Sequence, residues 1–186
     1  MVAGAHRVLA KLSVVGEVGD VALSREPVVV RQAQAADTAS MAEVHVRSWQ
    51  ETYRGVMPDA VLDDPDAVAR RTRFWNTVLT DSRFSDRVAA VAEVGGAIIG
   101  IAMAQPLLSA EPQQLHVLYV LRTHHGTGAG AALLDAVLRS DKPASLWVAD
   151  PNPRAQAFYR KHGFVADGNA KDEDGVREIR LRRASS

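Results

Sequence analysis

The sequence of 186 residues contains no cysteine. This absence excludes a disulfide framework, a thiol nucleophile and a thiolate metal site, and it fits a reducing compartment such as the cytoplasm. No apolar run reaches the roughly 18 residues that a membrane helix needs, so we expect no membrane partner. Neither sign of charge is in excess, because Lys and Arg total 22 and Asp and Glu total 22. Bulk charge therefore gives no indication of a nucleic-acid partner.

The length favours one domain with a core large enough to fold alone. The first residues have some apolar character, but Lys11, Glu17 and Asp20 interrupt it and make a poor signal peptide. We therefore divide the chain into an N-terminal extension over residues 1–26, whether or not it is ordered, and a folded domain over residues 27–186.

The most informative stretch runs from Leu115 to Leu138 (LHVLYVLRTHHGTGAGAALLDAVL). An apolar run over its first seven residues is typical of a buried strand, and apolar residues at helical spacing follow a glycine loop. Such a loop aims backbone N–H groups and the positive end of the helix at one point. A glycine lets a phosphate approach the backbone, where a Cβ would block it. The stretch therefore predicts a phosphate or pyrophosphate site at Gly126, Gly128 and Gly130.

Hydrophobic periodicity and turn residues predict the remaining elements. We expect one helix from an N-cap at Asp37 to about Tyr53, a helical turn after it, and further helices that pack by their apolar faces. The helical turn is expected at 59–64 and the helices at about 68–79 and 154–162; strands are expected at 28–33, 87–94, 97–105, 144–149, 164–166 and 176–182, and loops at 106–113 and 167–174. This order indicates a mixed α/β fold around one sheet.

Two segments resemble signatures of the GNAT N-acetyltransferases. Residues 125–130 (HGTGAG) resemble the family's pyrophosphate loop, whose pattern is Gln or Arg, two residues, Gly, one residue, and Gly or Ala. Asn152 followed by residues 157–164 (AFYRKHGF) resembles its second signature, an Asn and then Phe-Tyr-x-x-x-Gly-Phe. One helix and one strand separate the two signatures, as in the family. The resemblance extends over all but about the first 25 residues.

The resemblance implies a single mixed, mostly antiparallel sheet flanked by helices, with two splayed central strands. It also implies acetyl transfer from acetyl-CoA to a primary amine. The pantetheine arm would lie between the strands at 115–120 and 144–149, and backbone groups would hold the pyrophosphate. The cofactor-binding residues that it implies are Leu118, Tyr119, Val120, His125, Gly126, Thr127, Gly128, Ala129, Gly130, Asn152 and Tyr159.

Tyr159 is the general acid that the resemblance implies. An unperturbed phenol has a pKa of about 10, so it is a protonated donor for the leaving thiolate at neutral pH. The backbone N–H of Val120 is the expected oxyanion donor. The amine must lose a proton, and the family often has a Glu where this sequence has Gln114, which cannot act as a base. His116 lies on the same side of the strand and is the candidate base, with Glu111 as the alternative.

His125 stands where the family has Gln or Arg. A neutral imidazole offers less to a pyrophosphate, so we expect weaker but surviving CoA binding. Trp49 and Tyr53 share a helix face at the family's acceptor wall, and they are either substrate-binding residues or a core aromatic pair. The expected acceptor is a small-molecule amine, with a peptide or protein amine as the alternative. A homodimer, which is common in the family, stays open beside a monomer.

Other functional classes also stay open. The changes at Gln114 and His125 are compatible with a module that binds or senses acetyl-CoA without catalysis. Gly126, Gly128 and Ala131 fit the dinucleotide-binding pattern G-x-G-x-x-A, which would indicate a nicotinamide cofactor.

Several candidate residues have simpler roles available. Tyr159 is alternatively a packed aromatic beside Phe158, and His116 a hydrogen-bonded core histidine. The pair at residues 124–125 has no third histidine or carboxylate at ligand spacing, so we expect no metal. Three arginines most simply form a solvated helix face, with an anchor for an acidic substrate or partner as the alternative; they are Arg70, Arg71 and Arg73.

Overall fold

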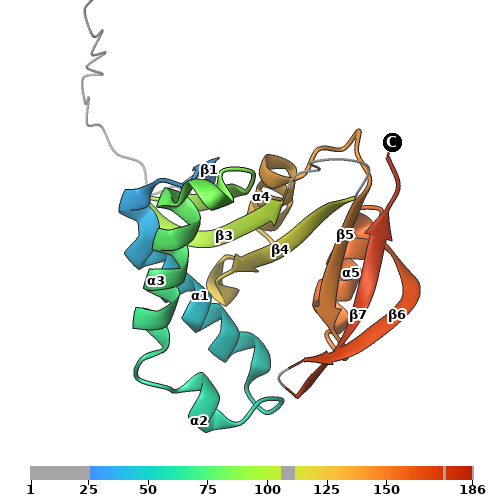
Figure 1. Ribbon diagram of the computed structural model, residues 1–186, viewed down its shortest axis with the longest axis horizontal. Coiled ribbons are helices and arrows are strands. Elements are labelled where there is room, and N and C mark those ends of the chain that lie inside the picture. The colour runs from blue at the N-terminus through green and yellow to red at the C-terminus, as the bar shows by residue number, and fades with distance from the viewer. Residues whose placement is uncertain (1–25, 106–111, 174, 186) are drawn as a thin grey trace, which may run out of the picture.

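The computed structural model describes residues 26–105, 112–173 and 175–185. The predicted N-terminal extension, apart from Glu26, and the alternative base Glu111 lie outside the described residues. The described chain forms one sheet in the order β1-β2-β3-β4-β5-β7-β6 (Figure 1). Its strands are β1 (Val29–Gln32), β2 (Val88–Val94), β3 (Ala97–Gln105), β4 (Gln113–Val120), β5 (Ala144–Ala149), β6 (Val165–Glu173) and β7 (Val176–Arg183).

Every neighbouring pair of strands is antiparallel except β4 and β5, which are parallel. The prediction of a single mixed, mostly antiparallel sheet is therefore confirmed. This sheet differs from the parallel, doubly wound sheet that dinucleotide-binding folds use, so the fold removes the main support for a nicotinamide cofactor.

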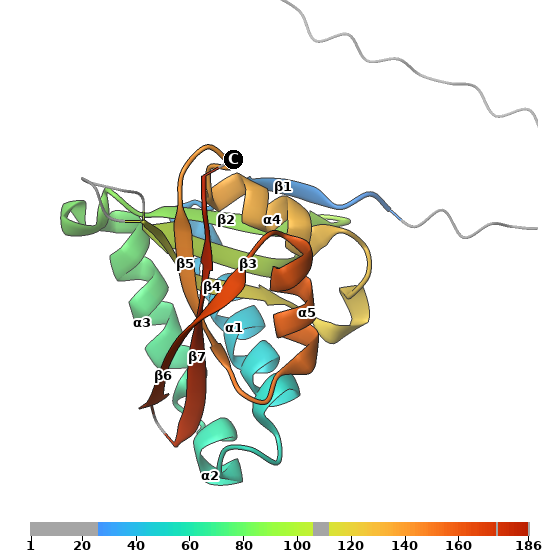
Figure 2. The same cartoon turned by 90° about the vertical axis from the view of Figure 1, so that its right-hand side faces the viewer.

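Helices cover both faces of the sheet, and Figure 2 shows α3 and α5 on opposite sides of the strands. No helix of the described residues is long and apolar enough to cross a membrane. The helices are α1 (Thr38–Tyr53), α2 (Asp59–Leu62), α3 (Ala67–Thr80), α4 (Ala129–Val137) and α5 (Pro153–Lys161), with 3-10 turns η1 (Ala35–Asp37), η2 (Ser82–Phe84) and η3 (Arg122–His124).

Alternation along the strands divides the interior into two main cores. Val91 of β2 packs in one core with Met41 of α1 and Trp75 of α3. Its neighbour Ala92 points to the other face, where it packs in a core with Leu133 of α4. All four larger side chains are fully buried. Burying a side chain of this size stabilises the fold by about 2–3 kcal/mol, so each helix is held to its face mainly by apolar contact.

The central feature of the sheet is the early end of pairing between β4 and β5. Their register covers only three pairs, from Gln113 with Ala144 to Leu115 with Leu146. Beyond this point β4 continues beside β3, β5 continues beside β7, and the two strands diverge (Figure 1). The predicted splay is therefore present.

A β-bulge lies at the start of the splay. Val117 pairs with Met103 and Leu115 pairs with Ala104, so His116 is the extra residue of β4. A bulge bends its strand and redirects side chains, and bulges are common beside active sites. The bulge therefore helps to turn β4 away from β5.

Two element boundaries differ from the predictions. The predicted loop at 167–174 is wrong, because β6 continues to Glu173 and pairs with β7 across a register shift between Ala166 and Ala170. Asp, Gly and Asn in this stretch favour turns. However, the neighbouring strand supplies hydrogen-bond partners, and the bulge accommodates Gly168 at φ +85°.

β4 also begins two residues earlier than predicted. The side chain of Gln113 is buried, and its Oε1 accepts a hydrogen bond from the backbone N–H of Arg139 at 3.0 Å. Its own N–H donates to the carbonyl oxygen of Pro143 at 2.9 Å. A polar residue such as Gln113 is typical of a loop, but here its side-chain amide ties β4 to the residue that follows α4.

Asp37 precedes α1 as predicted, but its carboxylate caps no N–H group of that helix. It accepts hydrogen bonds from Gln34 N at 2.7 Å and from two nitrogens of Arg31 at 2.7 and 2.8 Å. Arg31 also pairs with Glu93 of β2 at 2.5 Å. The hydrogen bond from Arg31 lowers the pKa of Asp37. These contacts join β1, the start of α1 and β2.

We expect Asp37→Asn to lower the free energy of unfolding by about 1–2 kcal/mol at pH 7, measured by urea denaturation. Because the pKa of Asp37 is lower in the folded chain, this stabilisation is present above about pH 4 and is lost as the pH falls through the folded-state value. The difference between wild type and variant should therefore shrink in acid. Asp141→Asn, which removes an exposed pair with Arg139, is the control and should have little effect. Equal effects of both substitutions would contradict the assignment.

Candidate active site

The glycine loop leads from β4 through η3 into α4. Gly126 and Gly128 have φ angles of +80° and +89°, and a Cβ on either would point into open space. The N–H groups of Gly126, Thr127 and Gly128 donate no hydrogen bond to the described part of the chain. The first turn of α4 adds further unpaired N–H groups. The loop is therefore a concentration of donors beside accessible backbone, as an oxyanion ligand requires.

Gly130 serves a different purpose. It lies inside α4, where a Cβ would approach the ring of Phe158 to 3.4 Å. The absence of a side chain here therefore allows α4 and α5 to pack closely. Its backbone N–H remains in the first turn of α4, beside the loop.

The side chain of His125 turns toward β4. Its Nε2 lies 2.7 Å from the carbonyl oxygen of Val120, and burial lowers the pKa of the imidazole. The ring is therefore neutral at pH 7, with Nε2–H donating to Val120 and Nδ1 left as a bare acceptor. The backbone N–H of His125 donates a hydrogen bond to the carbonyl oxygen of Arg122 at 3.2 Å. Neither group is then available to an anion, so His125 holds the loop against β4.

Leu118, Tyr119 and Val120, which are expected to meet the pantetheine arm, differ in the direction of their backbone N–H and C=O groups. Leu121 N donates to Ile99 O on β3 at 2.9 Å. Backbone groups alternate in direction along a strand, so those of Val120 and Leu118 face the splay and those of Tyr119 face β3. Tyr119 therefore contributes its side chain rather than its backbone, on the face of α1 and α3.

Asn152, which precedes α5, and Tyr159 within α5 are both tied into the fold. Asn152 Oδ1 accepts a hydrogen bond from Ala155 N at 3.1 Å and so caps the helix. The Tyr159 side chain is 8% exposed, and its ring lies 5.3 Å from that of Phe158 and 5.8 Å from that of Phe164. Burial, followed by the nearby phenol of Tyr53, raises the pKa of Tyr159, so its proton is retained.

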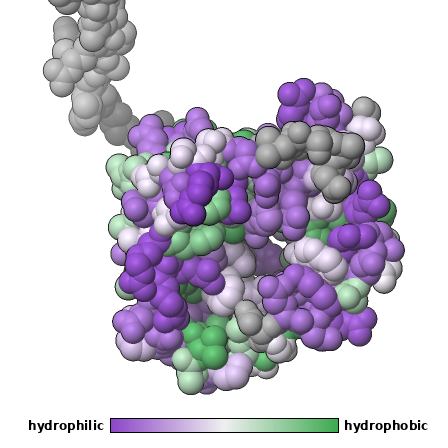
Figure 3. Space-filling model, in the orientation of Figure 1, coloured by the Kyte–Doolittle hydropathy of each residue, from purple (hydrophilic) through white to green (hydrophobic). Residues whose placement is uncertain are grey.

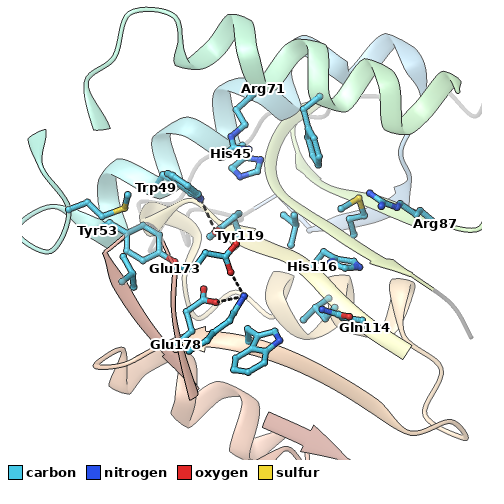
Figure 4. A pocket seen from close by; sticks show the side chains of 18 residues that line it. His45, Trp49, Tyr53, Arg71, Arg87, Gln114, His116, Tyr119, Glu173 and Glu178 are labelled. Carbon is cyan, nitrogen blue, oxygen red and sulfur yellow. Dashed lines mark hydrogen bonds and ion pairs between the residues drawn. The ribbon is translucent and has the colours of Figure 1, made fainter. Parts of the chain in front are cut away.

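A cavity of about 370 Å³ lies on the face of the splay opposite α4. The molecule is hollowed near the middle of the face shown in Figure 3. Trp49 and Tyr53 of α1, together with Gln114 and His116 of β4, line it. Residues of α3, β5, β6 and β7 complete its walls, as Figure 4 shows.

Aromatic side chains fix one wall of this cavity. Trp49 Nε1 donates a hydrogen bond to Tyr119 Oη at 2.9 Å, and the rings of Trp49 and Tyr53 are 5.6 Å apart. Burial raises the pKa of Tyr119 well above its ordinary value, so this hydroxyl also stays protonated. Trp49 and Tyr53 therefore pack against each other and also face the cavity.

His116 is exposed at the bulge of β4, where it faces the cavity. Partial burial in the cavity wall, followed by the positive charge of Arg87, lowers the pKa of its imidazole. The imidazole is therefore neutral at pH 7 and has a lone pair that can accept a proton. Its placement differs from that of a hydrogen-bonded core histidine.

Several further residues line the cavity, although the sequence did not single them out for this site. His45 of α1 is buried among the rings of Trp49, Trp75 and Tyr119, and burial lowers its pKa to about 3. Its position on the apolar face of the first helix was a usable signal. Arg71 was expected on a solvated helix face, but it precedes the buried Trp75 by one turn and faces the cavity.

The acidic wall comes from the β6–β7 hairpin. Glu173 and Glu178 both face the cavity, and the ammonium of Lys171 pairs with both of them, with Glu178 at 3.3 Å. Lys171 also lies 4.9 Å from the ring centre of Trp147 on β5. No local pattern predicts this wall, because it depends on the order of strands in the sheet.

Comparison with known proteins agrees with the two signatures. A family model described as an acetyltransferase (GNAT) domain matches residues 64–184. The chain is 28% identical over 145 residues to "Probable N-acetyltransferase Rv2775" of Mycobacterium tuberculosis, and the aligned residues cover 75% of this chain and 80% of that protein. It is 37% identical over 120 residues to "Uncharacterized N-acetyltransferase Rv2669" of the same organism, with 61% and 72% covered.

Solved structures share the fold. The PaiA N-acetyltransferase from Thermoplasma acidophilum, in complex with coenzyme A, has a TM-score of 0.67 at 19% identity and covers 84% of this chain and 98% of its own. The histone acetyltransferase HPA2 and related acetyltransferase from Corynebacterium glutamicum has a TM-score of 0.63 at 22% identity, with 86% and 97% covered. With its open glycine loop, its splayed strands and these relatives, the chain belongs to the GNAT family of N-acetyltransferases.

Proposed function

We propose that the protein transfers the acetyl group of acetyl-CoA directly to a primary amine of a small molecule. The observation that carries this proposal is the splay between β4 and β5, which has the glycine loop at its end and a cavity on its open face. A cofactor held by the loop would present its thioester at the cavity. The coenzyme A in the Thermoplasma acidophilum structure supports the same choice of cofactor.

The loop residues fit the pyrophosphate of acetyl-CoA. The N–H groups of Gly126, Thr127 and Gly128 are unpaired within the described chain. Because Gly126 and Gly128 have no Cβ, a ligand can approach their N–H groups without obstruction. Val120 N–H, which faces the splay, would stabilise the oxyanion that forms as the amine attacks the thioester carbonyl. His125 takes a positioning role, since its ring holds Val120 O.

Two side chains would move protons. His116 accepts the proton that the attacking amine releases, because its imidazole is neutral and faces the cavity. Tyr159 donates its phenolic proton to the sulfur as CoA leaves, because its raised pKa keeps that proton in place. The alternative, a module that binds acetyl-CoA without catalysis, would show binding but no CoA release.

We expect Gly128→Val to lower the affinity for acetyl-CoA by more than tenfold, measured by isothermal titration calorimetry, because a side chain would occupy the approach to the backbone. The control is Gly96→Val at the β2–β3 turn, where φ is +80° and a Cβ likewise meets open space. Both variants carry the same backbone strain, so only the first should lose binding. Unchanged affinity in Gly128→Val would exclude the loop as the phosphate site.

We expect Tyr159→Phe to lower kcat by about 100-fold while the Kd of acetyl-CoA changes little, since only protonation of the leaving thiolate is lost. CoA release at saturating amine measures kcat, and calorimetry measures Kd. A variant as active as the wild type would remove Tyr159 as the acid and leave its packing with Phe158 as its role.

We expect His116→Gln to remove the acidic limb of the pH–rate profile. In the wild type this limb should fall below about pH 6.5, because the pKa of His116 is lowered and activity requires the neutral imidazole. Gln114→Glu, added to His116→Gln, restores a base on the same cavity wall and should recover activity with the limb shifted to lower pH. A limb unaltered in His116→Gln would show that another group or the amine itself sets it.

A further inference from the structure

We propose that the acceptor amine also carries a carboxylate or a similar oxyanion, and that Arg71 binds this second group. The inference rests on the proposed function, and it names the chemical class of the acceptor. An amino acid with separated amine and carboxylate groups is the simplest member of this class.

Arg71 is a partly buried cation without a partner in the described residues. Its guanidinium carbon lies 4.7 Å from the ring centre of Trp49 and 6.0 Å from that of Phe74. Stacking on an indole holds the guanidinium in place but leaves its N–H groups unbonded. Neither an ion pair nor a hydrogen bond to the described chain involves this side chain, and burial lowers its pKa. Taking an unpaired charge out of water costs free energy, which an anionic ligand would recover.

Neighbouring arginines of α3 show that this arrangement is specific to one position. Arg70 pairs with Asp64 at 2.9 Å, away from the cavity. Arg73 is exposed and does not line the cavity. The expected solvated face therefore describes Arg70 and Arg73, and only Arg71 fits the alternative of an anchor for an acidic group.

A second guanidinium adds positive charge to the cavity lining. Arg87 lines the cavity, and its guanidinium carbon lies 4.5 Å from the ring centre of Phe84. Its Nε is buried and has no hydrogen-bond partner in the described chain. It lies near enough to His116 to lower the pKa of that imidazole. Two arginines thus add positive charge to the cavity lining, which disfavours a polycationic acceptor such as a polyamine.

The other side of the cavity fits the amine. In Figure 4, Glu173 and Glu178 lie on one side of Tyr119, and Arg71 with His45 lies on the other. Glu178 pairs across the sheet with Ala149 of β5, beside the splay. Glu173 and Glu178 carry two negative charges against the one positive charge of Lys171, so a substrate ammonium can still bind beside them. It would then lie next to the expected thioester, with the anionic end of the acceptor toward Arg71. The opposite charges orient one end of the acceptor for attack.

The test compares matched amines by the rate of CoA release. One series consists of unbranched amino acids with one to five carbons between amine and carboxylate, and the other consists of alkylamines of the same lengths without the carboxylate. For at least one length, we expect the amino acid to have a kcat/KM at least tenfold higher than the alkylamine of the same length, which lacks the carboxylate. Spermidine, a polycation, should be a poorer acceptor than that amino acid.

Variants of α3 then assign the preference to Arg71. Arg71→Gln should lower the ratio of the two kcat/KM values about tenfold, because the anion loses its partner. Arg71→Lys should retain part of the preference, since it keeps the charge but not the planar donor pair. Arg73→Gln, a substitution of the same kind on the exposed face of the helix, should leave the ratio unchanged.

The outcomes separate this inference from the proposed function. Turnover of alkylamines without preference for any amino acid, a preference for spermidine, or an unchanged ratio in Arg71→Gln would overturn the inference alone. Acetyl-CoA binding without turnover of any member of either series would also overturn it. Absence of acetyl-CoA binding in calorimetry would overturn the proposed function and the inference together.

Discussion

The separation of β4 from β5 after three residue pairs determines how the rest of the molecule is arranged. Backbone hydrogen bonds that neighbouring strands would otherwise exchange are left for a ligand, and the bulge at His116 accompanies the change in strand direction. The helices on the two faces then have different tasks. The α4 side carries the glycine loop, whereas the α1 and α3 side carries a cavity with charged walls.

The site also illustrates how burial sets proton positions. Tyr159 and Tyr119 are buried phenols, so burial raises their pKa values and keeps them protonated. His45 and His116 are shifted in the opposite sense, so both imidazoles are neutral at pH 7. One region of the protein thus holds proton donors and proton acceptors side by side without any charged histidine.

Local signals in the sequence predicted most of the fold and the open glycine loop between β4 and α4. The glycines at 126 and 128 and the Asn-to-Gly-Phe segment are recognisable because backbone conformation and helix ends depend on a few adjacent residues. The acidic wall was missed because it requires β7 to lie beside β5, which is a long-range arrangement. His125 was expected at the phosphate, yet its ring binds Val120 O across a turn. The sequence left Arg71 between a solvated helix face and an anchor for an acidic group, because neighbouring arginines on one helix cannot be told apart without the packing of that helix.

The most direct test of the account is a crystal structure of the protein with acetyl-CoA bound. We predict pyrophosphate oxygens on the N–H groups of Gly126 to Gly128, the thioester oxygen on Val120 N–H, and the sulfur within hydrogen-bonding distance of the Tyr159 hydroxyl. The acetyl group should then face the cavity between Arg71 and Glu178. A cofactor bound outside the splay, or a thioester remote from Tyr159 and from this cavity, would contradict the account.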